Sequence, residues 1–218
     1  MKVVVYVEGP SDVFAMKTLL KPLLEAKRHE GVRIEFAHAG KGDAKAYLLT
    51  RVPALAATKL PGEPETTIVV LPDLYPPGKA DFKDDSPAEL AEGVKGKLKA
   101  ALARKGGAAA GDVLARFQVF CFKHDLEALL LAVPDRLGNR LGLSSLRPSW
   151  RRPVEDQNHA KPPKYVVAEL FSKHRKKYDP QIDAPRILDG ADYRQVAQSC
   201  DQCFKPFVDF LESCGAVA

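Results

Sequence analysis

The sequence predicts an α/β protein with a doubly wound, mainly parallel β-sheet and a C-terminal helical cap. Three observations favour this class. Residues 2–7 and 67–71 are nearly continuous runs of β-branched and apolar residues, as expected for strands that are buried on both faces of a sheet. Segments with helical spacing alternate with the strands along the chain. With 218 residues, 45% of them hydrophobic, the chain is long enough to bury a core without disulfide or metal support.

Turn and capping residues set the limits of each element. Gly9 and Pro10 end the first strand, and Pro72 ends the third. Ser86 caps a helix that has Pro87 at its first position. The predicted elements of this part of the chain are a strand over 2–7, a helix from Ser11 to Leu24, a strand over 32–37, a helical stretch from Asp43 that is interrupted at Pro53, a strand over 67–71, a helix over 87–104, a flexible connector over 108–110, a strand over 117–122 and a short helix over 124–132.

The alternation stops after residue 142. Residues 143–163 are rich in Pro, Ser and Arg and lack apolar periodicity, which indicates a loop over the surface or the active face. Three helices, near 164–176, 192–200 and 203–214, have no strands between them, so we expect them to form the helical cap. The predicted organisation is an α/β domain over 1–142, with the basic loop and helical cap of 143–218 packed on it.

Composition excludes several protein classes. The four cysteines are too few and too unevenly spaced for a secreted disulfide scaffold. No apolar run approaches the roughly 20 residues that cross a bilayer, and the first 20 residues lack the pattern of a secretory signal. We therefore expect a cytoplasmic protein that does not contact membranes.

The positive charge is concentrated in one segment. Residues 147–178 hold nine of the 33 Lys and Arg residues but only three of the 28 Asp and Glu residues, whereas the whole chain carries a net charge of +5. Such a segment is typical of a phosphate-binding surface, although a solvated basic face is nearly as common. We predict that nucleic acid binds along this segment, through Arg147, Arg151, Arg152, Lys161, Lys164, Arg175, Lys176 and Lys177.

Acidic residues follow three of the predicted strands. Glu8 comes directly after the first strand and Asp73 after the third, while Asp125 and Glu127 follow the fourth. Asp12 lies one helical turn beyond Glu8. The carboxyl ends of parallel strands meet at one edge of a sheet, where ligands bind, and clustered carboxylates suit Mg²⁺ or Mn²⁺. Each acid also has an ordinary structural explanation, as a helix cap, a turn residue or a solvent-facing side chain.

The segment Val7-Glu8-Gly9-Pro10-Ser11-Asp12, followed by Val70-Leu71-Pro72-Asp73, resembles the TOPRIM fold, whose signature is a Glu after one strand and Asp-x-Asp after another. Within that group the chain is similar to the overcoming-lysogenization-defect (OLD) nucleases, and most similar to the bacterial family called domain of unknown function 4276. The segments that carry the second resemblance are Asp73-Leu74-Tyr75, His124-Asp125-Leu126-Glu127-Ala128-Leu129-Leu130 and Val154-Glu155-Asp156-Gln157-Asn158.

The resemblance implies a metal-dependent nuclease, in a bacterial defence or DNA-processing system. Glu8, Asp12, Asp73 and Glu127 would hold Mg²⁺ or Mn²⁺, and Lys164 would act as a cation beside the scissile phosphate. His124 is a candidate for proton transfer, with a buried structural histidine as the alternative. The implied catalytic residues are Glu8, Asp73, His124 and Lys164.

One departure from the TOPRIM signature supports a rival function. Tyr75 stands where the second Asp is expected, so one carboxylate of the usual metal site is missing. The rival is a catalytically degraded module that binds nucleic acid or an ATPase partner. A phosphohydrolase acting on a small nucleotide is a further alternative. For Cys200 and Cys203 we expect positions in the core, because neither a redox motif nor a zinc site is complete around them.

Overall fold

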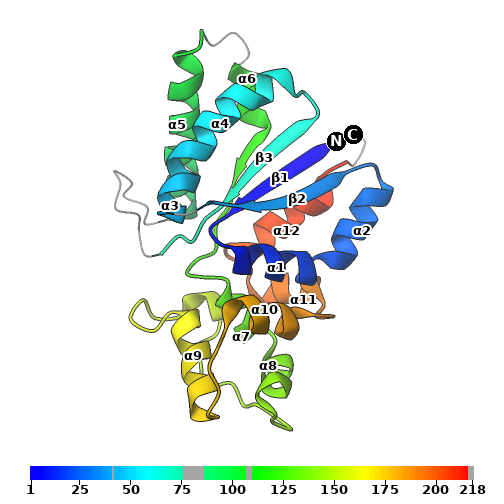
Figure 1. Cartoon of the computed structure of the whole chain (residues 1–218), viewed down its shortest axis with the longest axis vertical. Coiled ribbons are helices and arrows are strands. Elements are labelled where there is room, and N and C mark those ends of the chain that lie inside the picture. The colour runs from blue at the N-terminus through cyan, green and yellow to red at the C-terminus, as the bar shows by residue number, and fades with distance from the viewer. Residues whose placement is uncertain (41, 76–85, 107–109, 216–218) are drawn as a thin grey trace.

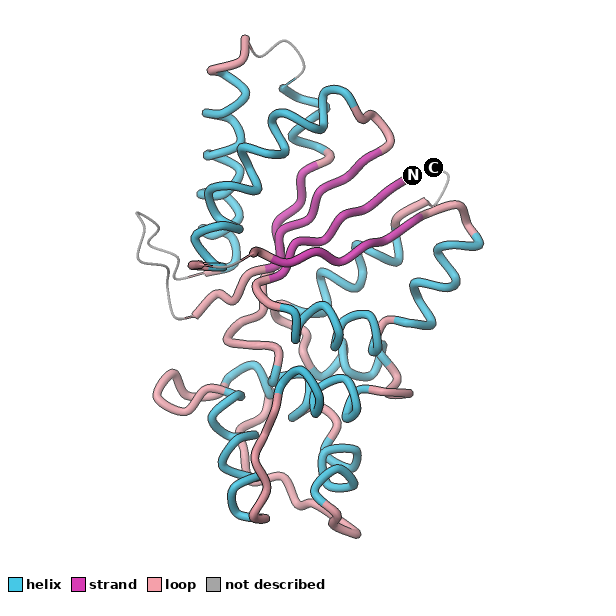
Figure 2. The backbone as a smooth tube through the Cα atoms, in the orientation of Figure 1, coloured by secondary structure: helices cyan, strands magenta, loops and turns pink. Residues whose placement is uncertain are grey.

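A computed structural model describes residues 1–40, 42–75, 86–106 and 110–215. Its centre is a four-stranded sheet in the order β2-β1-β3-β4, with every neighbouring pair parallel. The four strands all end at one edge of the sheet, and further helices lie beyond that edge (Figure 2). The strands are β1 (Lys2–Val7), β2 (Arg33–His38), β3 (Thr66–Leu71) and β4 (Phe117–Val119).

Helices cover both faces of the sheet (Figure 1). Alternate side chains of β3 enter two separate hydrophobic clusters: Val69 and Leu71 pack on one face, Ile68 and Val70 on the other. This division follows from the period of two along a strand and accounts for the nearly continuous apolar sequence of β3. The first face carries α1 (Pro10–Leu19), α2 (Lys21–His29) and α12 (Phe204–Ser213); the second carries α3 (Ala44–Ala46), a π-helical segment (Tyr47–Arg51), α4 (Val52–Lys59), a 3₁₀ turn (Leu60–Gly62), α5 (Pro87–Ala103) and α6 (Ala110–Ala115).

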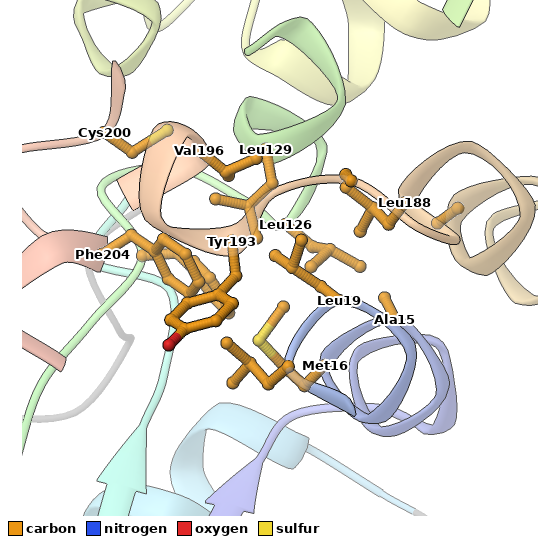
Figure 3. Packing of buried hydrophobic residues seen from close by; sticks show 14 of the residues in the cluster. Ala15, Met16, Leu19, Leu126, Leu129, Leu188, Tyr193, Val196, Cys200 and Phe204 are labelled. Carbon is orange, nitrogen blue, oxygen red and sulfur yellow. The ribbon is translucent and has the colours of Figure 1, made fainter. Parts of the chain in front are cut away.

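The remaining helices form a group at the carboxyl edge of the sheet. Leu19 of α1 and Leu188 of α10 enter one buried cluster together with Leu129, Tyr193 and Phe204 (Figure 3). This shared core fixes the helical cap to the sheet. The group comprises α7 (Glu127–Leu131), α8 (Pro134–Leu141), a 3₁₀ turn (Val154–Asp156), α9 (Pro163–Lys173), α10 (Pro180–Leu188) and α11 (Tyr193–Ser199).

The predicted α/β class, a doubly wound parallel sheet with a C-terminal helical cap, is confirmed. The helix over 87–104 is also confirmed as α5, and the Ser86 side chain accepts a hydrogen bond from Glu89 N as its cap. No described helix is long and apolar enough to cross a membrane.

Several element limits differ from the prediction. Four helices follow residue 163 rather than three, because α10 forms although Pro180 and Pro185 both lie in it. Pro53 does not interrupt its helical stretch: the π-helical segment Tyr47–Arg51 leads directly into α4, whose first turn contains Pro53. Regular pairing of β4 ends at Val119, and only an isolated bridge joins Phe122 to Asp73. The predicted helix over 124–132 is shorter, because α7 begins at Glu127. The connector expected over 108–110 lies mostly outside the described residues, and Ala110 begins α6.

Candidate functional site

An acidic cleft lies at the carboxyl edge of the sheet, between the strands and the helical cap. Its volume is about 230 Å³. The ends of β1 and β3, the first turns of α1 and α9, and the start of α7 contribute to its wall. The charged residues that line it are five acids and one lysine: Glu8, Asp12, Asp73, Asp125, Glu127 and Lys164. Gly9, Ser11, Ala44 and Leu126 complete the lining.

Hydrogen bonds fix the acids on the sheet side of the cleft. Glu8 Oε1 accepts a hydrogen bond from Asp73 N at 3.0 Å, which links the ends of two neighbouring strands. Asp12 Oδ2 accepts one from Gly9 N at 2.9 Å, at the start of α1. A carboxylate near a helix N-terminus is electrostatically favourable, so Asp12 stabilises α1 and lines the cleft.

The acids on the cap side are held just as firmly. Both oxygens of Asp125 accept hydrogen bonds from Lys164 N, at 3.1 Å each, which ties the first turn of α9 to the segment that precedes α7. Glu127 is 3% exposed, and its Oε1 accepts a hydrogen bond from Tyr178 OH at 3.0 Å. The orientation of the cap is therefore coupled to the acids of the cleft.

Burial raises the pKa of every acid in the cleft, and repulsion from neighbouring acids adds to this effect for all of them except Asp12. For Asp73, burial raises the pKa well above its ordinary value, and the charges of Glu8 and Asp12 add to this effect. Burial, together with the charge of Glu127, raises the pKa of Asp125 to about 8. The Lys164 ammonium acts in the opposite direction on Asp125 and Glu127, but their pKa values remain raised. The pKa values of Glu8 and Asp12 are likewise raised, by burial first. A bound cation would relieve this repulsion.

The chemistry of these donors fits a hard divalent cation. All five acids offer oxygen atoms, which are the ligands that Mg²⁺ and Mn²⁺ prefer. Within the described part of the chain, however, no three Asp, Glu, His or Cys side chains converge closely enough to form a ready-made metal site. The four predicted metal ligands, Glu8, Asp12, Asp73 and Glu127, thus meet around one cleft rather than at one point, and metal binding by them stays a prediction.

His124 and Tyr75 belong to a different group of side chains. The His124 ring is 3% exposed and does not line the cleft; its centroid lies 5.6 Å from that of Tyr75 and 5.2 Å from that of His159. Burial, followed by the charge of His159, lowers the pKa of His124. Its Nε2 has no hydrogen-bond partner among the residues that the structure describes. The position that the TOPRIM signature reserves for a second acid is thus turned toward two histidines, and proton transfer by His124 stays a prediction.

The predicted nucleic-acid-binding residues are all exposed but do not form one group around the cleft. Lys164 alone among them lines it. Arg152 lines a separate pocket with Ser199 and Asp201. Lys176 Nζ donates hydrogen bonds to the carbonyl oxygens of Arg140 and Leu141 at the end of α8, so it also stabilises the cap. Lys161 Nζ lies 4.0 Å from Glu169 Oε2. The remaining predicted residues are Arg147, Arg151, Arg175 and Lys177.

Two residues of the site were not predicted. Lys45 Nζ donates a hydrogen bond to the carbonyl oxygen of Leu74, and its charge lowers the pKa of Glu8. Tyr178 orients Glu127 from the segment between α9 and α10. Lys45 follows the second strand and its turn, so the sequence could have placed it at the carboxyl edge of the sheet. No local sequence pattern indicates that Tyr178 belongs to the site. Cys200 and Cys203 are free and buried, as predicted for core residues.

Comparisons with known proteins identify the family of the chain. No curated protein matches the chain. Two of the solved structures that match contain the C-terminal region of the OLD protein of Xanthomonas campestris pv. campestris. One is 15% identical with a TM-score of 0.44, and the other is 15% identical with a TM-score of 0.42; each alignment covers 96% of this chain and 95% of the other. The model of the family described as "Domain of unknown function (DUF4276)" matches residues 7–212. Because this match extends over nearly the whole sequence, the chain belongs to the DUF4276 family.

Proposed function

We propose that the protein hydrolyses phosphodiester bonds of nucleic acid in a reaction that depends on Mg²⁺ or Mn²⁺. One observation carries this proposal: five carboxylates from the sheet and the cap share a cleft with Lys164. No single structural role explains why acids with raised pKa values gather there. The proposal rests on the chemistry of the cleft.

Each residue of the cleft has a proposed role. Glu8, Asp12, Asp73 and Glu127 would hold the divalent ion, which when bound supplies a more acidic water and neutralises charge on the phosphate. The Lys164 ammonium would lie beside the scissile phosphate and stabilise the charge that develops on its oxygens. Asp125 would keep the first turn of α9 in place through Lys164 N. Tyr178 would orient Glu127.

Exposed basic residues in and around the cap provide for a polymeric substrate. Lys164 would contact the phosphate in the cleft, while Lys161, Arg175 and Lys177 would bind more distant phosphates. A small nucleotide would need no charge so far from the cleft. The protein would act in the cytoplasm, as part of a bacterial defence or DNA-processing system with an ATPase partner.

The test is a substrate panel of single-stranded and duplex DNA, RNA and small nucleotides, each with Mg²⁺, Mn²⁺ or EDTA. We expect metal-dependent cleavage of nucleic acid by the wild type and a loss of at least about 100-fold in Glu8→Gln, which keeps the shape of the side chain but removes its charge. Glu35→Gln is the matched control, because Glu35, on β2, pairs with Lys2 of β1 and with Arg33, and does not line the cleft. Cleavage that survives Glu8→Gln would contradict the assigned site.

A second candidate, a module that binds nucleic acid or an ATPase partner without cleavage, is favoured by Tyr75. Tyrosine replaces the second acid of the TOPRIM signature at this position, and the centroid of its ring lies 4.4 Å from that of His159. Binding without cleavage under every metal would support the module. Cleavage of small nucleotides alone would instead support a phosphohydrolase.

A further inference from the structure

We propose that Tyr165 is a stacking site for an unpaired nucleobase, so that the cleft takes single-stranded nucleic acid. The inference rests on the proposed function for the identity of the ligand as nucleic acid. It goes further by naming the form of the substrate and a residue that selects it.

Tyr165 has an unusual combination of exposure and position. Its side chain is 51% exposed, and it is one of four large hydrophobic residues in the described chain that remain exposed. It follows Lys164, which lines the acidic cleft, in the first turn of α9 (Figure 1, lower left). Successive residues of a helix differ by about 100° around its axis, so the two exposed side chains lie on adjoining parts of one surface.

One cation lies beside the Tyr165 ring, and another precedes it in the chain. Lys161 Nζ lies 5.6 Å from the ring centroid, and Lys164 is the preceding residue. An exposed aromatic ring with cations nearby is a combination with which proteins bind single strands, because the ring stacks on a base while the cations contact neighbouring phosphates. Lys161, which also lies 4.0 Å from Glu169, and Lys164 supply positive charge for a polyanion, and the ring adds a contact to a base.

Stacking on Tyr165 requires a base whose face is accessible. In a duplex both faces of each base are covered by its neighbours, and exposing one requires unstacking and unpairing. A single strand has no such requirement. The geometry therefore favours a single strand whose base lies on Tyr165 while a neighbouring phosphate enters the cleft beside Lys164.

The test measures the affinity of labelled 12-nucleotide strands by fluorescence anisotropy, with EDTA present to prevent cleavage. Separate arms use single-stranded DNA, single-stranded RNA, a duplex of the same sequence and an abasic strand of the same length. The variants are Tyr165→Ala, Tyr165→Phe and Phe14→Ala. Phe14, on α1, is the matched control because it is equally exposed at 51%.

We expect the wild type to prefer at least one single strand over the duplex and over the abasic strand. Tyr165→Ala should weaken single-strand binding about 5- to 150-fold and bind the normal and abasic strands alike. Tyr165→Phe and Phe14→Ala should stay within about twofold of the wild type, and the slope of affinity against salt should be unchanged, since no phosphate contact is removed. Because Tyr165 is exposed, its replacement leaves the core intact, which circular dichroism checks.

Equal binding by wild type and Tyr165→Ala, or equal affinity for duplex and single strand, would overturn the inference. These failures are separate from failure of the proposed function. Metal-dependent cleavage with no effect of Tyr165→Ala leaves the nuclease and removes the stacking site. Base-dependent binding through Tyr165 without any cleavage keeps the stacking site and removes the nuclease.

Discussion

At the scale of single residues, the acids of the cleft combine a structural contact with a candidate chemical role. Glu8 joins the ends of β1 and β3, Asp12 stabilises the start of α1, and Asp125 holds the start of α9. A structural explanation alone would have sufficed for any one of them. Their convergence on one cleft is what the structural explanations do not account for.

Tyr178 is the side chain that compensates most directly for the burial of Glu127. Its hydroxyl donates the hydrogen bond at 3.0 Å to a carboxylate that is 3% exposed. Tyr178→Phe should therefore lower the free energy of unfolding by about 1.5 to 3 kcal/mol, the usual range for a hydrogen bond to a charged group. Urea denaturation measures the change at constant metal concentration.

Tyr193→Phe is the matched control for this prediction. Tyr193 OH donates to Glu212 Oε1 at 2.9 Å, but Glu212 is 33% exposed and also pairs with Arg194. Water can replace the lost hydrogen bond there, so the expected loss is at most about 1 kcal/mol. Equal losses in the two variants would show that Tyr178 does not support Glu127 in particular.

At the scale of elements, local pattern predicted the strands well and the cap less well. β1 and β3 were predictable because a strand that is buried on both faces is apolar at every position. α10 was missed because Pro180 and Pro185 are signals for the end of a helix. The structure places Pro180 in the first turn and compensates for Pro185 by packing α10 against α1, a contact between segments about 170 residues apart that no local pattern encodes.

A buried ion pair anchors α10 to α8. The Asp183 side chain is 4% exposed; its Oδ1 lies 2.5 Å from Arg140 Nη2, and its Oδ2 accepts a hydrogen bond from Asp179 N. Arg140→Ala leaves this carboxylate without its cation, and we expect the free energy of unfolding to fall by about 2 to 3 kcal/mol in urea titrations. Arg186→Ala, on α10 itself, is the control; if it were equally destabilising, the ion pair would not be the cause.

The candidate site was predictable to the extent that strand ends mark it. Glu8 and Asp73 follow their strands directly, so the topology of a parallel sheet suffices to bring them together. The side chain of Tyr75 follows the same strand but packs on His159, and the predicted basic residues spread over the cap. The positions of several of these basic residues depend on the path of residues 143–163, and the sequence of this segment has no apolar periodicity from which its path could be predicted.

At the scale of the whole molecule, the cleft joins the two parts of the fold. Glu8, Asp12 and Asp73 come from the sheet and its first helix, whereas Glu127 and Lys164 come from the cap. A cation that binds acids from both parts would stabilise their arrangement, since a ligand that binds only the folded state raises its stability. Without a cation, the same acids repel one another across the cleft.

Burial of the cleft acids, together with this repulsion, predicts how the stability of the metal-free protein depends on pH. The cleft acids have raised pKa values, about 8 in the case of Asp125, so between about pH 5 and pH 8 the folded state binds more protons than the unfolded state. The free energy of unfolding must then fall as pH rises through this range. Surface acids such as Glu35 and Glu212, whose pKa values are lowered, are ionised in both states there and add no slope. The pKa of His124 is lowered in the folded state, so near the ordinary pKa of histidine this residue makes the free energy of unfolding rise with pH.

Thermal unfolding in EDTA and in Mg²⁺, at pH 5 and pH 8, separates these contributions. We expect the midpoint in EDTA to be lower at pH 8 than at pH 5, and Mg²⁺ to raise it more at pH 8, where the acids must otherwise lose their protons without a cation. Asp125→Asn keeps an oxygen that can accept from Lys164 N but has no proton to lose, so its midpoint should depend less on pH while His124 still titrates. A wild-type midpoint in EDTA that rises toward pH 8 as steeply as that of Asp125→Asn would mean that burial and repulsion do not raise the pKa values of the cleft acids, and the electrostatic reason for a cation there would be gone.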